Sequence, residues 1–529
     1  MVFFEGYPGC IARVLWLTRE MPDRFFLTTA IDYVNGRPHL GHAYEKILAD
    51  VLVRYHRSLG EETFFLTGVD EHGQKVQQSA QAQGIPPQQF CDGMSAHFEA
   101  LWGKLGVSFD RFVRTTAPAH KEVVRKFLQQ LKDADQIYFK EHEGYYSTRQ
   151  EQFVTEKEQV DGVWPEIYGE VVKTKEPNYF FKLSAYQDWL RQYITDHPEF
   201  IFPAFRRNEV LAALEKPLND LCISRPKSRL EWGIPLPFDE DYVTYVWFDA
   251  LVNYVSFADH GLPTDRWPAD AHVIGKDILI PAHAVYWPIM LKALGLEQPR
   301  QFVVHGWWMN RGAKMSKSVG NVIDPEPYLE KFGADAIRYF VMREMSLGQD
   351  ADFTDEKFIQ RYQSDLGNDL GNLVQRTLSM IHRYRQGVVP VRTEAALTPV
   401  DRELESEEAI RLYRESMDGK QTHIALQNVW QFVQRTNQYV EQTAPWKLAK
   451  EEADAARLDV VLGTLAESVR RIAILIGAFL PQTSVRIFEQ LGVSPEGLLA
   501  EAAFSAKLAG RTISAPQPLF PRFEVEKGT

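Results

Sequence analysis

Residues 25–69 constrain the fold of this chain most, because a strand, a helix and a second strand follow one another there. Residues 25–31 and 63–69 are apolar and rich in β-favouring side chains, as buried strands are. Between them, apolar side chains recur with helical spacing over residues 40–59, and Gly60 suits the end of a helix. This order within one short segment predicts a βαβ unit, and therefore a parallel sheet.

A first polar motif lies where such a sheet binds ligands, beyond the carboxyl ends of its strands. His39 and His42 are three residues apart in the first turn of the predicted helix, so they share one face, and Asp70 follows the second strand. A helix N-terminus attracts anions, and imidazoles there can donate to phosphate oxygens. Gly41 lets the backbone approach a flat adenine or ribose. Taken alone, the two histidines fit a capping or core role equally well.

A second polar motif is the loop segment Lys314-Met315-Ser316-Lys317-Ser318. Its two lysines can neutralise the charge that builds on the β- and γ-phosphates as pyrophosphate leaves. Removing one such contact costs about 3–4 kcal/mol in the transition state. A lone pair of lysines at this spacing is usually a solvated loop. Together with the histidine motif, however, it indicates a site for the ATP triphosphate and a nucleotidyl-transfer reaction.

The chain of 529 residues is too long for one hydrophobic core, so several domains are expected. Residues 1–24 form an extension, which a start at Met21 would explain. Strands of the sheet are expected to resume at 242–248, 271–274 and 301–305, and long helices at 359–386, 401–444 and 455–492. The predicted domains are a first half of the nucleotide-binding domain (25–135), a Tyr- and Pro-rich insertion (136–241), a second half (242–310), a lysine loop with a connecting region (311–357) and a helical domain (358–529).

Composition excludes some classes of function. The net charge of −12 argues against general coating of nucleic acid, although one basic face remains possible. No apolar run approaches the ~20 residues of a membrane span, so no membrane partner is expected. Three cysteines that are far apart form no disulfide framework, which favours a cytoplasmic location.

The two motifs resemble the signatures of the class I aminoacyl-tRNA synthetases. Residues 67–73 (TGVDEHG), 245–249 (YVWFD), 274–278 (IGKDI) and 306–321 resemble the methionyl-tRNA synthetase family in particular, and the resemblance runs from about residue 25 to 450. It implies an α/β fold with a Rossmann-type parallel-sheet catalytic domain, split by an insertion and followed by an all-α anticodon-binding bundle. It also implies a ligase that forms methionyl-adenylate from L-methionine and ATP with Mg²⁺, and then charges tRNA(Met), initiator tRNA included.

The resemblance also implies a role for individual residues. The catalytic groups would be His39, His42, Lys314 and Lys317. ATP would contact Gly41, Gly275, Asp277, Lys314, Met315, Ser316 and Lys317. Methionine would lie among Ile31, Tyr33, Asp70, Trp247, Ala250, Leu251, Tyr254 and His283, with Asp70 on its α-ammonium group. The anticodon would be read by Asn372, Arg376, Pro445 and Trp446.

Three features depart from the pattern of the family. A bulky aromatic residue usually precedes the pocket histidine, but here Ala282 precedes His283 and the stretch is one residue longer. Many relatives hold zinc with four cysteines, whereas no cysteine lies between Cys91 and Cys222, so no protein-bound zinc is expected. We expect a metal-free knuckle packed by Tyr145, Tyr146 and Phe153. The chain ends soon after the bundle, which leaves no room for a dimerising module and favours a monomer.

Two alternatives stay open. A class I ligase for another apolar amino acid shares both motifs, but it would usually carry a larger editing insertion than residues 136–240. A non-catalytic tRNA-binding relative would be expected to have lost some of the four histidines and lysines, all of which are present. Amino-acid-dependent ATP–pyrophosphate exchange across the twenty amino acids distinguishes these possibilities.

Overall fold

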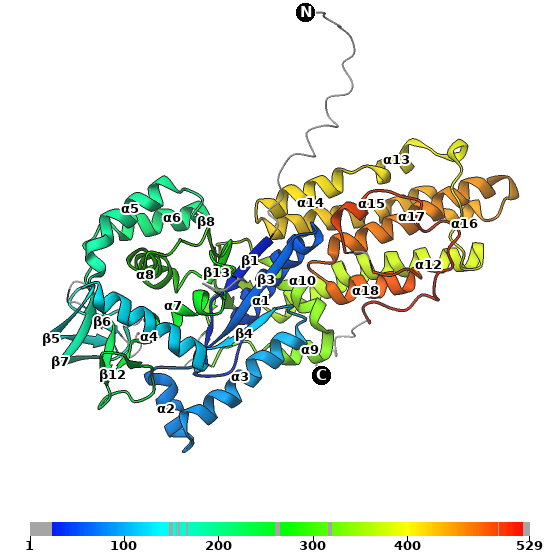
Figure 1. The fold of residues 1–529 in the computed structure, drawn as a ribbon. Coiled ribbons are helices and arrows are strands. Elements are labelled where there is room, and N and C mark those ends of the chain that lie inside the picture. The colour runs from blue at the N-terminus through cyan, green and yellow to red at the C-terminus, as the bar shows by residue number, and fades with distance from the viewer. Residues whose placement is uncertain are drawn as a thin grey trace, which may run out of the picture.

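The computed structural model describes residues 24–147, 152–154, 156, 159–165, 168–259, 265–315, 320–495 and 497–521. A domain built on a sheet carries a smaller antiparallel insertion at one end and a helical bundle at the other (Figure 1). None of the described helices combines enough length and apolar character to cross a bilayer.

The main sheet is parallel throughout, as the βαβ pattern predicts. Its strand order is β2-β3-β1-β13-β14-β8, with β4 also beside β3. Its seven strands are β1 Arg24–Thr29, β2 Asp32–Tyr33, β3 Glu62–Asp70, β4 Arg111–Arg114, β8 Ile201–Phe202, β13 Ala271–Gly275 and β14 Phe302–His305.

The order of the strands sets the place where a ligand can bind. After β1 the chain forms α1 (Leu40–Ser58) and returns as β3 on one side of β1, whereas β13 lies on the other side. The loops that follow β1 and β13 therefore leave the sheet in different directions. In open α/β sheets this switch point opens a crevice at the carboxyl ends of the strands.

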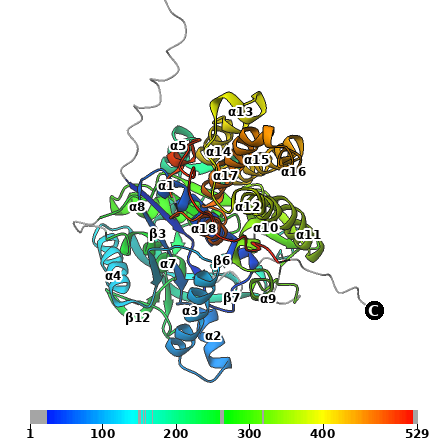
Figure 2. The same cartoon turned by 90° about the vertical axis from the view of Figure 1, so that its right-hand side faces the viewer.

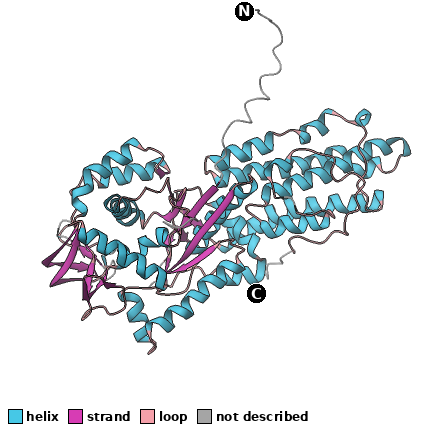
Figure 3. Ribbon diagram, in the orientation of Figure 1, coloured by secondary structure: helices cyan, strands magenta, loops and turns pink. Residues whose placement is uncertain are grey.

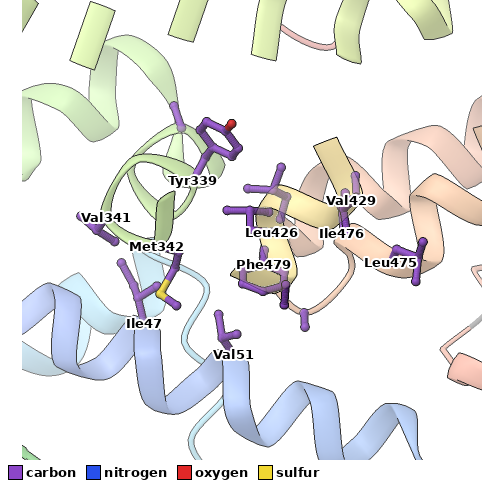
Figure 4. Packing of buried hydrophobic residues seen from close by; sticks show 14 of the residues in the cluster. Ile47, Val51, Tyr339, Val341, Met342, Leu426, Val429, Leu475, Ile476 and Phe479 are labelled. Atoms are coloured by element: carbon purple, nitrogen blue, oxygen red, sulfur yellow. The ribbon is translucent and has the colours of Figure 1, made fainter. Parts of the chain in front are cut away.

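Helix α1 ties the sheet to the rest of the molecule. It is buried along most of its length, and Gly60 after its end has a φ of +85°, a conformation that favours glycine. Ile47 and Val51 of α1 face Met342 of α10 (Ala334–Glu344) in an apolar cluster that continues into the helical bundle (Figure 4). The sheet domain and the bundle thus share one continuous core.

The prediction that the main sheet resumes with a strand at residues 242–248 is wrong in two respects. Strand β12 (Asp239–Thr244) pairs antiparallel with β10 (Ser224–Pro226) and β11 (Pro235–Leu236) in a small separate sheet. The chain then turns at Tyr245 and continues as helix α7 (Val246–Ser256). Helix α7 is buried on nearly all sides. The mainly apolar run of residues 242–248 has no periodicity that separates a strand from a helix.

The insertion is mainly an antiparallel sheet of β6 (Gln152–Val154), β5 (Ile137–Ser147), β7 (Val171–Phe181) and β9 (Leu221–Cys222), in that order. Tyr146 is buried in it, with the guanidinium of Arg229 at 3.9 Å from the ring centroid. The predicted insertion also contributes β8 to the main sheet. Within the described part of the chain, no three His, Cys, Asp or Glu side chains lie close enough together to hold a metal ion.

The C-terminal region is helical, whereas strands gather in the sheet domain and the insertion (Figures 2 and 3). The long stretch expected at 401–444 is three helices, interrupted near Ser406 and at residues 419–421. The helices from residue 355 onward are α11 Asp355–Arg361, a π-helical segment Tyr362–Gly371, α12 Asn372–Arg385, α13 Pro399–Glu405, α14 Glu408–Asp418, α15 Thr422–Thr443, α16 Pro445–Leu448, α17 Ala455–Ile476 and α18 Pro481–Gln490.

Candidate active site and anticodon surface

A cavity of about 450 Å³ lies at the carboxyl ends of β1, β3, β13 and β14, a volume that suits a small-molecule site. It brings together nearly all the residues predicted to bind ATP and methionine. Ser316 and Lys317 lie outside the described residues. The predicted residues that line the cavity are Ile31, Tyr33, His39, Gly41, His42, Asp70, Trp247, Ala250, Leu251, Tyr254, Gly275, Asp277, His283, Lys314 and Met315.

The two histidines cap helix α1 and line the cavity at the same time. Nδ1 of His39 accepts from the Gly41 backbone N–H, and Nδ1 of His42 accepts from the His39 backbone N–H, both at 3.1 Å. The proton of each neutral ring is therefore on Nε2. The ring centroids are 3.8 Å apart, so two N–H donors lie side by side at a helix N-terminus. The capping role and the phosphate-binding role are compatible.

Gly41 and Gly275 lie directly against side chains that line the cavity. A Cβ atom on Gly41 would lie 2.9 Å from the His39 ring, which is closer than a real Cβ approaches another atom. A Cβ atom on Gly275 would lie 2.6 Å from Oδ1 of Asp277. Glycine at these two positions therefore leaves room for one imidazole and one carboxylate at the cavity wall.

The Lys314 ammonium lies over the ring of Trp307, a cavity residue that the sequence analysis missed. The distance from Nζ to the ring centroid is 3.6 Å, and Lys276 lies over the same ring at 4.0 Å. Lys276 is also paired with Asp350 at 2.7 Å. A cation over an indole face is stabilised by the ring quadrupole, so Trp307 holds the lysine loop near the cavity.

A charge network centred on the buried Lys46 includes cavity residues that the sequence analysis does not predict, namely Asp32, Glu45 and His305. Nζ of Lys46 donates to the Ala30 carbonyl at 2.8 Å and to Glu45 at 2.7 Å, and it is paired with Asp32 at 3.1 Å. Burial raises the pKa of Asp32 to about 7, although Lys46 opposes the shift. Burial also disfavours the charged form of Glu45, but Lys46 and His305 outweigh it and lower that pKa. The network fixes α1 against the loop that carries Ile31 and Tyr33.

Helix α7 supplies an apolar wall through Trp247, Ala250, Leu251 and Tyr254. His283 lies beside this wall, and burial lowers its pKa to about 4, so its imidazole is neutral at pH 7. Nδ1 of His283 is 2.9 Å from the Ile278 carbonyl and must donate to it. Nε2 therefore accepts the hydrogen bond of the Tyr254 hydroxyl at 2.8 Å.

Residues Leu279–Tyr286, which include His283, do not form one regular helix, because Ile280 has non-helical φ and ψ angles of −114° and 126°. After this kink, the His283 backbone N–H donates to the Ile278 carbonyl at 3.2 Å, five residues earlier in the chain, as in a π-turn. Ala282 is 2% exposed and belongs to the interior. His283 itself lines the cavity.

Asp70 ends β3, where Tyr33 of β2 is its neighbour in the parallel register. Its side chain is nearly buried and lines the cavity. One carboxylate, the ring of Tyr33 and the apolar wall of α7 can receive an amino acid with an ammonium group and an unbranched apolar side chain.

A second predicted site lies in the bundle. Trp446 is 36% exposed in α16, which begins at the buried Pro445. The Arg376 guanidinium of α12 lies 5.8 Å from the Trp446 ring centroid and is paired with Glu441 at 2.7 Å. Asn372 is exposed one turn earlier on α12. An exposed indole beside a guanidinium and an amide can stack on an unpaired base and read its edges.

Two family models match successive parts of the chain. The model of the class I tRNA synthetases (M) matches residues 25–174 and 164–378. The model of the anticodon binding domain of methionyl tRNA ligase matches residues 390–528. Together they cover both the cavity and much of the bundle.

Individual relatives match along almost the whole chain. The methionine–tRNA ligase of Deinococcus radiodurans is 45% identical over 518 residues, which is 96% of this chain and 75% of the relative. That of Caldanaerobacter subterraneus is 42% identical over 513 residues, 96% of this chain and 80% of the relative. A Mycobacterium tuberculosis methionyl-tRNA synthetase solved with methionyl-adenylate is 40% identical, with a TM-score of 0.88 over 94% of this chain and all of that one.

Proposed function

This chain belongs to the methionyl-tRNA synthetases of class I and is an ATP-dependent methionine–tRNA ligase, and on this premise we propose the residues that carry its reaction. The observation that supports the proposal is the cavity, which collects side chains from separate segments of the chain at one switch point of the sheet. Methionine would occupy the side near Asp70 and α7, and ATP the side near His39, His42 and Asp277.

In the first step, a carboxylate oxygen of methionine attacks the α-phosphorus of ATP, and the bond from that phosphorus to the bridging oxygen breaks. Pyrophosphate leaves with Mg²⁺, which we propose arrives on ATP. Nε2–H groups of His39 and His42 would donate to phosphate oxygens, and Lys314 and Lys317 would neutralise the leaving charge. No side chain forms a covalent bond, so catalysis consists of positioning and charge stabilisation.

In the second step, a ribose hydroxyl of the 3′-terminal adenosine of tRNA(Met) attacks the methionyl carbonyl carbon, and AMP leaves. We propose that Asn372, Arg376, Pro445 and Trp446 recognise the anticodon at the far end of the bundle. We further propose that the enzyme is a monomer, works in the cytoplasm and charges initiator tRNA as well. Size-exclusion chromatography with light scattering reports the mass directly.

Asp70→Asn tests the proposed methionine side of the cavity. The substitution keeps the shape but removes the charge that would pair with the α-ammonium group. A hydrogen bond to a charged group contributes roughly 1.5–3 kcal/mol, so we expect KM for methionine to rise by about tenfold or more. KM for ATP should stay nearly unchanged. Both are measured by ATP–pyrophosphate exchange.

Asp277→Asn is the matched control, because it makes the same chemical change on the proposed nucleotide side. It should raise KM for ATP and leave KM for methionine nearly unchanged. If Asp70→Asn raised both constants equally, or left KM for methionine unaltered, Asp70 would not bind the ammonium group.

A further inference from the structure

A buried cluster of His72, Asp249 and His120 joins the two walls of the proposed methionine pocket. Nδ1 of His72 lies 2.6 Å from Oδ2 of Asp249, and Nε2 of His120 lies 2.7 Å from Oδ1. His72 follows Asp70 by two residues in the loop after β3, and Asp249 lies in the first turn of α7 beside Trp247 and Ala250. Neither histidine nor Asp249 lines the cavity itself.

The cluster is shielded from solvent. The residues are 2%, 0% and 0% exposed for His72, Asp249 and His120. Nδ1 of His120 is 2.7 Å from the Ser256 hydroxyl near the end of the same helix α7, so α4 (Pro118–Asp133) holds α7 at two points. Burial disfavours the charged form of Asp249, but the two histidines outweigh it and lower its pKa to about 2. A carboxylate therefore accepts a hydrogen bond from each ring.

We infer that Asp249 is a positioning residue, which sets the separation between the Asp70 side and the α7 side of the pocket through His72 and His120. The inference rests on the proposed methionine site. Its effect is specific to one substrate, because the histidines and glycines of the nucleotide side lie at the start of α1 and in β13, which contribute no residue to the cluster. A shift of α7 changes the fit of the amino acid side chain and leaves the phosphate donors in place.

A graded pair of variants at Asp249 tests the inference. Asp249→Ala removes both acceptors, so α7 loses its anchor to the loop and to α4. We expect KM for methionine to rise on the order of tenfold, since small misplacements of binding groups have large effects, while KM for ATP changes less than about twofold. In Asp249→Asn, the amide oxygen can still accept from His72, and the amide N–H can donate to His120 once that ring changes tautomer. Its KM for methionine should therefore lie between that of the unaltered enzyme and that of Asp249→Ala.

Asp401→Ala is the matched control. Asp401 is an equally buried carboxylate in the bundle, bonded to Tyr439, Arg457 and Thr398. It should lower thermal stability without separating the two KM values. If Asp249→Ala fails to fold, His72→Ala and His72→Asn replace it, because the asparagine amide can occupy the place of the Nδ1–H donor and should restore KM for methionine.

The outcomes separate this inference from the proposed function. A selective rise in KM for methionine, with partial rescue by the conservative variant, supports positioning by Asp249. An unchanged KM for methionine, or an equal rise in both constants, overturns it. Because Asp70→Asn tests the pocket directly, a normal response there combined with no response at Asp249 would refute the inference alone.

Discussion

Replacing His39 by Asn and His42 by Gln slows methionyl-adenylate formation by about 10²- to 10³-fold, the loss seen when a preorganised donor is removed from a developing charge. Both substitutions preserve the start of helix α1. Asparagine is among the best N-cap residues, and glutamine is a standard partner at the third helical position of a capping box. What disappears is the pair of imidazole Nε2–H groups at the cavity.

Rapid-quench measurement of adenylate formation, with both substrates saturating, isolates this effect from binding. The melting temperature is the control, and it should change by no more than a few degrees because the caps remain. If slower adenylate formation came with a large fall in melting temperature, the histidines would be needed only to start helix α1. An unaltered rate would remove them from the catalytic step.

Trp446→Ala reduces charging of tRNA(Met) while leaving ATP–pyrophosphate exchange unchanged. Stacking of an unpaired base on an indole contributes roughly 1–3 kcal/mol, so kcat/KM for charging should fall roughly ten- to a hundredfold. Exchange stays normal because the cavity lies in the sheet domain, away from α16. Steady-state charging and exchange on the same preparation give both numbers.

Trp446→Phe and Val485→Ala serve as controls for this experiment. Phenylalanine retains a stacking surface next to Arg376 and should recover most of the activity. Val485 of α18 is 40% exposed, about as much as Trp446, and its truncation should leave charging unchanged. Normal charging by Trp446→Ala would show that the anticodon is bound elsewhere on the bundle.

The parts of the fold that could be predicted are those with local signals. The βαβ unit follows from residues 25–69 alone, since two buried strands flank an amphipathic helix, and its parallel pairing is confirmed. The histidine and lysine motifs are short segments, and their chemistry can be inferred from their residues without knowledge of the fold. The first residues of helix α7 are predicted as part of a strand, because the apolar residues 245–248 are also typical of a buried strand. Only the surrounding structure decides between strand and helix.

The parts that could not be predicted depend on partners far apart in the chain. Asp249 is 177 residues from His72 and 129 residues from His120 in the sequence, so no local spacing predicts that they form a cluster. For Lys46 the sequence holds one weak signal, because it and Glu45 are charged residues between the apolar Tyr44 and Ile47 of α1. Its contact with Asp32 depends on the turn after β1. Trp307 acquires its role only when the loop places Lys314 over its ring.

A crystal structure with a non-hydrolysable methionyl-adenylate analogue would show directly whether the cavity binds its ligand as proposed. We predict the thioether against Trp247 and Tyr254, the ammonium group on Asp70, the phosphate within hydrogen-bond distance of His39 and His42, and the ribose on Asp277. A ligand whose phosphate lay away from both histidines, or whose side chain did not reach the wall formed by α7, would contradict the proposed site.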